Sequence, residues 1–243
     1  MNLAKSYEFF NPDKCKDTIN IIGCGSVGST VAELLSRHGL KNAKLYDFDV
    51  VEEHNLVNQM FTTKNLYKPK LEAVYDRWVE VNPEAAKTIK LYGDGWDGQK
   101  LSGYVFMCVD NIELRKRIVE ENKNNINIKA MFDFRTALDT AQHYAADWSK
   151  SSDIKALLDT MDFTHEEAHE ATPVSACGVE LSVVYTVKAI TAFGIANMVK
   201  WLQGQDTYKT MAIVNMDTFT IDAFKAKPRK QKSFIESVNI KTA

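Results

Sequence analysis

The sequence predicts an α/β protein, built on a mostly parallel sheet with helices on both faces and extended by antiparallel strands near the C-terminus. Three observations indicate this fold. An apolar run at 19–22 leads through a glycine-rich turn into a helical pattern, strand-length and helical segments alternate as far as residue 132, and two β-rich runs stand close together at 211–215 and 218–224. Such alternation is typical of βαβ units, whose strands pair in parallel.

The elements of the first half follow from their periodicity and their boundary residues. The strand at 19–22 runs into the turn Gly23-Cys-Gly25-Ser-Val-Gly28, and Gly39 ends the next helix as a C-cap. A helix that starts near Pro69 is stopped by Asn82-Pro83. The predicted elements are helix 29–38, strand 43–46, loop 52–58, helix 69–81, strand 88–92, strand 104–109, helix 112–122 and strand 126–132.

After Phe134 the alternation gives way to a mixed pattern. The predicted elements are an antiparallel strand at 140–146, a polar loop with short helices at 149–171, a long helix at 179–203 that ends near Gly204, and a closing hairpin of strands 211–215 and 218–224. We therefore expect a single Rossmann-like domain over residues 1–225. The basic residues beyond it indicate a solvated, mobile tail at 226–243.

The composition is that of a globular protein. Of 243 residues, 45% are hydrophobic and 26% charged, enough apolar material for a sizeable core. With 30 Lys and Arg against 32 Asp and Glu the net charge is −2, so nothing favours nucleic acid or an anionic membrane as a partner. Lys188 and Lys200 interrupt the longest apolar stretch, which fits a buried helix and not a membrane span. The N-terminus shows no signal-peptide pattern, and we expect a cytoplasmic protein.

Two patterns bear on metal binding. The cysteines are scattered without a CxxC pair, which argues against a disulfide framework and a structural zinc site, so we expect reduced thiols and no zinc; they are Cys15, Cys24, Cys108 and Cys177. The stretch His165-Glu-Glu-Ala-His169 matches the HExxH pattern of zinc hydrolases. Its polar flanks end the helix within a turn, and we interpret these histidines as solvent-facing.

The glycine-rich turn is the strongest functional signal, because a strand precedes it and a helix follows it, as a phosphate-binding loop requires. Gly23 permits the tight turn, Gly25 lets phosphates approach the backbone, and Gly28 lets the helix pack on the strand. Asp47 lies nineteen residues after Gly28 at the end of the second strand, where a carboxylate can accept hydrogen bonds from ribose hydroxyls. These features predict a nucleotide site and fit NAD and ATP equally.

A series of ordered motifs follows the glycine loop. They are Asp47-Phe-Asp49, Asn55-Leu-Val-Asn58-Gln59, Tyr67-Lys-Pro-Lys70, Val81-Asn-Pro83 and Cys108-Val-Asp110-Asn111. Together they resemble the ThiF/MoeB superfamily of ubiquitin-activating-like adenylyltransferases over roughly residues 19–128, with a weaker echo at 177–204. The resemblance implies a Rossmann-like fold, use of ATP and Mg²⁺, and a homodimer.

The resemblance also implies a role for each motif. Asp47 would hold the ribose, Asn55 with its neighbours and Lys70 the phosphates, and Asp110, beside Asn111, the magnesium. From the residues alone, Lys70 is equally a solvated lysine at a helix start, and Asp110-Asn111 equally an N-cap. The implied ATP-binding set is Gly23, Gly25, Ser26, Gly28, Asp47, Asp49, Asn55, Asn58, Lys70, Asp110 and Asn111.

One position departs from the family pattern. Where relatives carry an arginine that touches the phosphates, this chain has Asn58, whose neutral amide cannot replace a guanidinium. The candidates to compensate are Lys64, Lys68 and Arg135. Arg135 is a candidate contact for a phosphate or a substrate carboxylate, and an ion pair with Asp133 or Asp139 is the alternative.

Cys177 precedes the long predicted helix, whose N-terminus would stabilise its thiolate. The residue is therefore a candidate catalytic acceptor for an acyl or sulfur intermediate. The alternative is a small, half-buried side chain that packs the start of the helix.

The sequence thus predicts an ATP-dependent adenylyltransferase that activates the C-terminal carboxylate of a small ubiquitin-like or sulfur-carrier protein, or of a peptide, and releases pyrophosphate. Lys70 and Asp110 would carry the chemistry, because attack of a carboxylate on the α-phosphorus brings two anions together. Two alternatives stay open. Asn58 points to a catalytically weak nucleotide-binding scaffold or partner subunit, and the glycine loop with Asp47 alone would suit an NAD(P)-dependent oxidoreductase.

Overall fold

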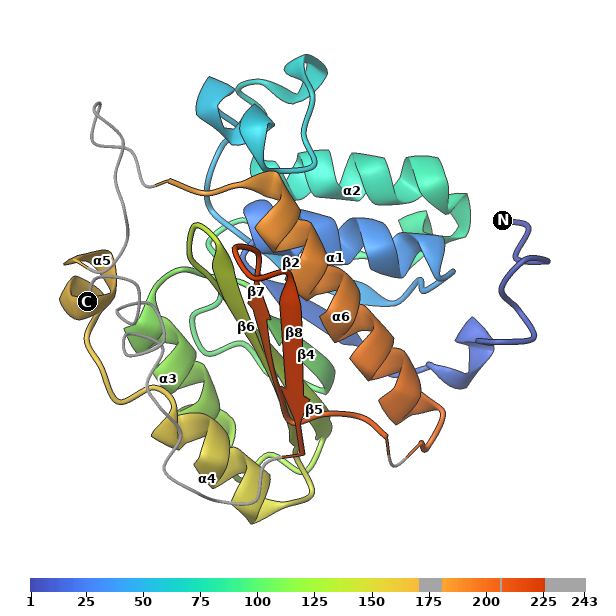
Figure 1. Cartoon of the computed structure of the whole chain (residues 1–243). Coiled ribbons are helices and arrows are strands. Elements are labelled where there is room, and N and C mark those ends of the chain that lie inside the picture. Colours follow the sequence, from blue (N-terminus) through green and yellow to red (C-terminus); the bar gives the residue numbers. More distant parts are fainter. Residues whose placement is uncertain (171–180, 206, 226–243) are drawn as a thin grey trace.

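The computed structural model describes residues 1–170, 181–205 and 207–225, so Cys177 and the predicted tail at 226–243 lie outside the described residues. Its centre is an eight-stranded sheet with the strand order β3-β2-β1-β4-β5-β6-β7-β8 (Figure 1). The strands are β1 (Ile19–Ile22), β2 (Ala43–Tyr46), β3 (Lys90–Tyr92), β4 (Gly103–Met107), β5 (Ile128–Thr136), β6 (Thr140–Asp147), β7 (Met211–Asn215) and β8 (Thr220–Phe224).

Strand direction divides the sheet into two parts. The first five strands all pair in parallel, whereas the pairs β5–β6, β6–β7 and β7–β8 are antiparallel. The fold class predicted from the sequence is confirmed, including the closing hairpin. From β1 the chain continues to β2 on one side of the sheet, and from β4, on the other side of β1, it continues outward to β5. The loops that leave β1 and β4 therefore run in opposite directions at the carboxyl ends of these strands, where open α/β sheets bind ligands.

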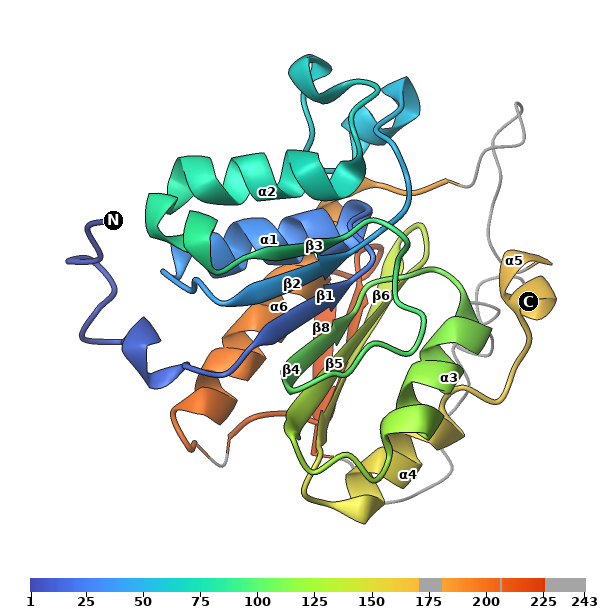
Figure 2. The same cartoon turned by 180° about the vertical axis from the view of Figure 1, so that it is seen from behind.

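Helices cover both faces of the sheet. α1 (Ser26–Arg37), α2 (Lys70–Val81) and α6 (Val184–Leu202) lie on one face, with α3 (Ile112–Asn122) and α4 (Ser151–Asp159) on the other (Figure 2). Each group forms its own apolar core with the sheet. In the described part of the chain, none of the helices combines the length and the apolar character that a membrane span needs. The shorter helices are α5 (His165–Glu170), η1 (Pro12–Lys14), η2 (Glu53–Val57), η3 (Thr63–Asn65) and η4 (Pro83–Lys87).

Several predicted boundaries need correction. The first helix begins at Ser26 and not at residue 29, because the glycine turn leads straight into it. The long helix begins at Val184, preceded by extended backbone at Val183. The fifth strand runs on to Thr136, because its charged residues Asp133 and Arg135 are buried as an ion pair and need not face solvent.

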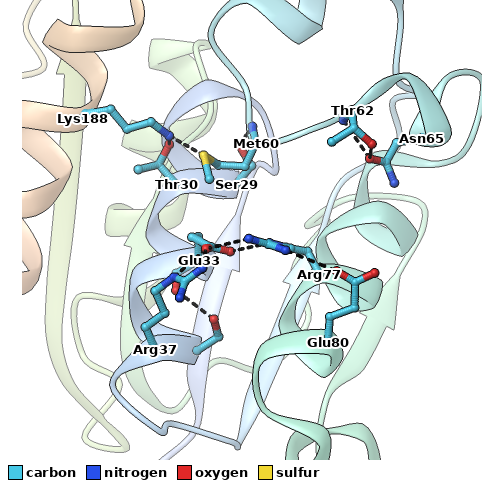
Figure 3. Close-up of polar contacts among 11 residues, drawn as sticks. Ser29, Thr30, Glu33, Arg37, Met60, Thr62, Asn65, Arg77, Glu80 and Lys188 are labelled. Atoms are coloured by element: carbon cyan, nitrogen blue, oxygen red, sulfur yellow. Dashed lines mark hydrogen bonds and ion pairs between the residues drawn. The ribbon is translucent and has the colours of Figure 1, made fainter. Parts of the chain in front are cut away.

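A buried carboxylate ties the first two helices together. Glu33 of α1 is buried, and its oxygens accept hydrogen bonds from Arg37 on the same helix and from Arg77 of α2, which also pairs with Glu80 (Figure 3). Burial by itself would raise the pKa of Glu33, but the hydrogen bonds from Arg77 and Arg37 outweigh burial and lower it. The network therefore fixes α1, which starts at the glycine loop, against α2, which starts at Lys70.

His143 on β6 makes the stability of the fold depend on pH. Its ring is fully buried between Phe132 and Phe134, and burial lowers its pKa from 6.5 to about 4. Below pH 6.5 the imidazole of His143 is protonated in the unfolded chain, whereas it stays neutral in the folded protein. The stability contributed by neutral His143 is thus present above pH 6.5 and is lost as the pH falls toward 4.

We expect the free energy of unfolding to fall by about 2 kcal/mol between pH 6.5 and 5, measured by urea titration. The control is His143→Gln, which cannot titrate in this range and should show a much flatter dependence. Equal slopes for the two proteins would show that other groups cause the effect.

Candidate functional site

A cavity of about 630 Å³ opens at the carboxyl edge of the parallel strands. The segments that line it are the glycine loop after β1 with the start of α1 (Gly23, Gly25, Ser26 and Val27), residues 47–49 after β2, residues 108–110 after β4, and residues 134–136 at the end of β5. This is the crevice that the strand order creates beside β1. The fold therefore brings residues that are far apart in the sequence into one site.

The glycine loop leaves no room for a side chain at two of its three glycines. Gly23 has a φ of +92°, and a Cβ there would lie 2.8 Å from the backbone carbonyl of Cys108. At Gly28 a Cβ would lie 1.8 Å from the carbonyl oxygen of Gly23. A Cβ at Gly25 would meet nothing within 4 Å, and Gly25 lines the cavity. Gly23 and Gly28 are therefore required by packing, whereas Gly25 leaves space that a ligand can occupy.

The start of α1 supplies backbone donors to the cavity. Its N-cap is Gly25, which has no side chain to satisfy the first N–H groups, and Ser26 follows it in the cavity wall. Free N–H groups and the partial positive charge of a helix N-terminus attract anions. A phosphate group fits this part of the cavity.

Asp47 connects the loops that follow β1 and β2. Its carboxylate accepts hydrogen bonds from the N–H of Cys24 at 2.5 Å and from the N–H of Asp49 at 2.8 Å. Burial raises the pKa of Asp47, and the two hydrogen bonds oppose that rise. Asp47 lines the cavity, and each of its oxygens keeps a further lone pair for a ligand hydroxyl. Its role toward ribose stays a prediction.

Lys70, the first residue of α2, is only 8% exposed, so its reading as a solvated lysine is wrong. Its ammonium donates to the carboxylate of Asp49 at 2.8 Å, and its backbone N–H donates to the carbonyl of Asp49, also at 2.8 Å. Both residues line the cavity. The side-chain and backbone bonds together hold the ammonium at the cavity wall.

The segment at 53–59 forms another part of the wall. Asn55 is buried, and its Oδ1 accepts the N–H of Glu52, which closes η2. Asn58 and Gln59 follow, and both line the cavity. The Oε1 of Gln59 is buried and has no hydrogen-bond partner among the described residues, so it marks a place where a ligand donor would be satisfied. The predicted site omitted Gln59, although it stands next to Asn58 in the same motif.

The lysines proposed to replace the missing arginine do not reach this wall. Lys64 and Lys68 are exposed and are not among the residues that line the cavity, and Lys68 lies 4.0 Å from Asp76. Among the three predicted substitutes, Arg135 alone lines the cavity.

Asp110 and Asn111 have different environments. Asn111 is the N-cap of α3, and its side chain accepts the N–H of Leu114 at 2.7 Å, as the N-cap alternative requires. Asp110 is exposed, lines the cavity and makes no hydrogen bond or ion pair with the described residues. Carboxylate oxygens suit Mg²⁺, so Asp110 is free to bind an ion where Asn111 is already engaged.

Two arginines share one buried carboxylate beside the cavity. Arg115 and Arg135 both line the cavity and both bond to Asp133, which is fully buried. Arg135 also donates to the carbonyl and hydroxyl of Thr160, and it lies 4.6 Å from the ring centre of Tyr144. Burial by itself would raise the pKa of Asp133, but the two guanidiniums outweigh burial and lower it. The ion-pair alternative for Arg135 is correct, and the cluster carries one net positive charge.

Arg115 was missing from the predicted site, although a signal was present. It stands at helical spacing with Ile112 and Ile118 on the face of α3 that packs against the sheet. A charged residue on an apolar face needs a buried partner. That partner, Asp133, comes from a strand later in the chain, which the sequence does not reveal.

The remaining candidates are weak. α5 has six residues, His165 is exposed, and within the described residues there is no group of three His, Cys, Asp or Glu side chains that could hold a metal ion. Cys24 and Cys108 are buried, and burial raises the pKa of both thiols. A thiol with a raised pKa is a poor nucleophile at neutral pH, so neither cysteine suits a catalytic role.

Comparison with known proteins agrees with these features. The model of the ThiF family matches residues 14–235. Ubiquitin-like modifier-activating enzyme 5 of Drosophila persimilis is 32% identical over 134 residues, which cover 49% of this chain and 34% of that protein. The Caenorhabditis elegans enzyme of the same name is 29% identical over 133 residues, covering 49% of this chain and 31% of that protein. The matched region is about a third of the length of these relatives.

Solved structures share the fold at low identity. PaaA has a TM-score of 0.66 and 14% identity, over 90% of this chain and 67% of that one. Escherichia coli MccB with ATP has a TM-score of 0.63 and 16% identity, over 92% of this chain and 67% of that one. Because the family model spans nearly the whole sequence, the chain belongs to the ThiF family.

Proposed function

We propose that this protein is an ATP-dependent adenylyltransferase that activates the C-terminal carboxylate of a small ubiquitin-like or sulfur-carrier protein, or of a peptide, and releases pyrophosphate. The observation that carries the proposal is that Gly25, Lys70 and Asp110 line one cavity of about 630 Å³. A cavity of this size suits a nucleotide. Family membership and the curated relatives named ubiquitin-like modifier-activating enzyme 5 support the same class of reaction.

The cavity residues supply what adenylation needs. A carboxylate that attacks the α-phosphorus of ATP meets a second anion, so positive charge must lie close by. Lys70 provides an ammonium, the start of α1 provides N–H donors, and Asp47 provides acceptors for ribose hydroxyls. Asp110 would hold Mg²⁺, which, when bound, supplies further positive charge beside the phosphates.

The cluster of Arg115, Asp133 and Arg135 supports recognition of a further anion. Its net positive charge lies beside the cavity, and its hydrogen bonds to Asp133 and Thr160 hold the Arg135 guanidinium in place. A fixed guanidinium is well suited to a carboxylate or a phosphate. We assign this cluster to the acceptor carboxylate, which must lie next to the α-phosphate.

The partner and the assembly belong to the same proposal. MccB, which shares this fold, has been solved in complex with N-formylated MccA, which supports a small protein or peptide as the acceptor here.

We also propose a homodimer in the cytoplasm. The support comes from exposed Phe219, Ile221 and Phe224 at the β8 edge. Light scattering should show twice the chain mass of 27.5 kDa.

Calorimetric titration tests the nucleotide class. We expect ATP with Mg²⁺ to bind at least about tenfold more tightly than NADH, because Lys70 and Asp110 favour a polyphosphate with its metal. Tighter binding of NADH, unchanged in Asp110→Ala, would contradict the proposal and favour an oxidoreductase.

Radiolabelled pyrophosphate should exchange into ATP when a β-grasp protein ending in Gly-Gly is added. Binding of ATP without exchange would favour a nucleotide-binding scaffold.

A further inference from the structure

Lys188 of α6 lies directly behind the cavity wall. Its ammonium donates to Thr30 Oγ1 on α1 at 2.9 Å and contacts the sulfur of Met60 (Figure 3). The side chain is half-buried. Lys188 therefore bridges three segments, namely α6, α1 and the chain that follows the cavity-lining stretch 58–59.

Both residues that Lys188 contacts are directly connected to residues that line the cavity. Thr30 Oγ1 donates to the carbonyl of Ser26 at 2.9 Å, and Ser26 lines the cavity at the start of α1. Met60 comes next in the chain after residues 58–59, which line the cavity as well. Its N–H donates to Ser29 Oγ at 3.1 Å, so this stretch rests on the first turn of α1.

The charge of Lys188 is not neutralised locally. Among the described residues no carboxylate lies within 4 Å of its ammonium, and its partners are a hydroxyl and a thioether. Each lysine and arginine that lines the cavity contacts a carboxylate: Lys70 pairs with Asp49, and Arg115 and Arg135 share Asp133. Glu33, whose charge acts on Lys188, is already bonded to Arg37 and Arg77.

A half-buried ammonium without a counter-ion is unfavourable, and burial lowers the pKa of Lys188 accordingly. An anion bound on the other side of Ser26 would relieve this cost. The N-terminus of α1 attracts an anion at the same place, and Asn58 beside it contributes no charge.

We propose that Lys188 is a positioning residue for the phosphates of the nucleotide. It places a positive charge behind the start of α1, where it acts through Thr30 and Ser26, and it holds the stretch at 58–60 against α1. The inference rests on the proposed function, because it takes ATP as the ligand. Lys188 would thus supply the positive charge that Asn58 lacks, from a helix that lies more than a hundred residues later in the chain.

The test compares two ligands that differ only in their phosphates, ATP with Mg²⁺ and adenosine, by calorimetry on the full chain. Lys188→Met removes the charge and keeps an unbranched side chain. We expect its Kd for ATP to rise roughly tenfold, as for loss of one unit charge in a partly desolvated site, and its Kd for adenosine to change less than about twofold. Lys188→Arg should bind ATP within about threefold of wild type, because it keeps the charge.

Lys200→Met is the matched control, the same substitution at an exposed position of the same helix, and it should change neither affinity. Unchanged ATP affinity in Lys188→Met would overturn the inference. An equal loss for ATP and adenosine would also overturn it, because that result indicates a structural role only. Lys188→Gln gives the same comparison if the methionine variant does not fold. Failure of the wild type to bind ATP would instead refute the proposed function.

Discussion

Replacement of Asp133 by asparagine is expected to destabilise the protein by about 3–5 kcal/mol. Asparagine keeps the size of the side chain and one acceptor oxygen, but it removes the charge. Arg115 and Arg135, which are 5% and 4% exposed, would then hold two positive charges inside the protein without a counter-ion. Urea unfolding at pH 7.5 measures the difference.

A surface ion pair provides the matched control. Asp97 lies 2.7 Å from Arg117, and both side chains are well exposed. Asp97→Asn should cost less than about 1 kcal/mol, because solvent screens an exposed pair. If Asp133→Asn proved as stable as Asp97→Asn, the buried cluster would not contribute to stability, and its guanidiniums would be satisfied by solvent.

Replacement of Asp110 by alanine is expected to slow acceptor-dependent pyrophosphate exchange by roughly two to four orders of magnitude, the scale of loss when a group that stabilises charge is removed. Binding of ATP should also lose its dependence on Mg²⁺. The free energy of unfolding should change by less than about 0.5 kcal/mol, because Asp110 is exposed and unbonded among the described residues. Exchange kinetics and calorimetry with and without Mg²⁺ measure these effects.

Asp94 offers a control within the same cavity. It is exposed and lines the cavity from the turn after β3, so Asp94→Ala removes an equal charge and should leave exchange within a few-fold of wild type. Undiminished exchange in Asp110→Ala would overturn the metal assignment. Equal losses in the two variants would show a general effect of cavity charge.

Cys177, which lies outside the described residues, belongs to a separate step. Adenylation needs no thiol, so Cys177→Ser should leave exchange within a few-fold of wild type. If the cysteine is an acceptor, the variant would form no thiol-linked intermediate. Formation of the complete product at the normal rate would show that Cys177 is structural.

Elements whose signals are local were predicted well. The glycine turn between 19–22 and α1 was found because the strand, the turn and the helix pattern stand next to one another in sequence. Helix 112–122 and the closing hairpin were found for the same reason. The sequence predicts a fifth strand that ends at residue 132, because Asp133 and Arg135 are charged. The strand continues to Thr136, since these two side chains are buried as an ion pair.

The sequence by itself determined which elements form and which residues are candidates to bind phosphates, because glycine turns, periodicity and motif spacing depend on residues close together in the chain. Only the tertiary structure decided which charges at the cavity are paired. Lys70 is held by Asp49 and Arg135 by Asp133, whereas Asp110 has no partner among the described residues. Ion pairing depends on strand order and helix packing. These bring together residues as distant as Lys188 and Thr30, which are 158 positions apart.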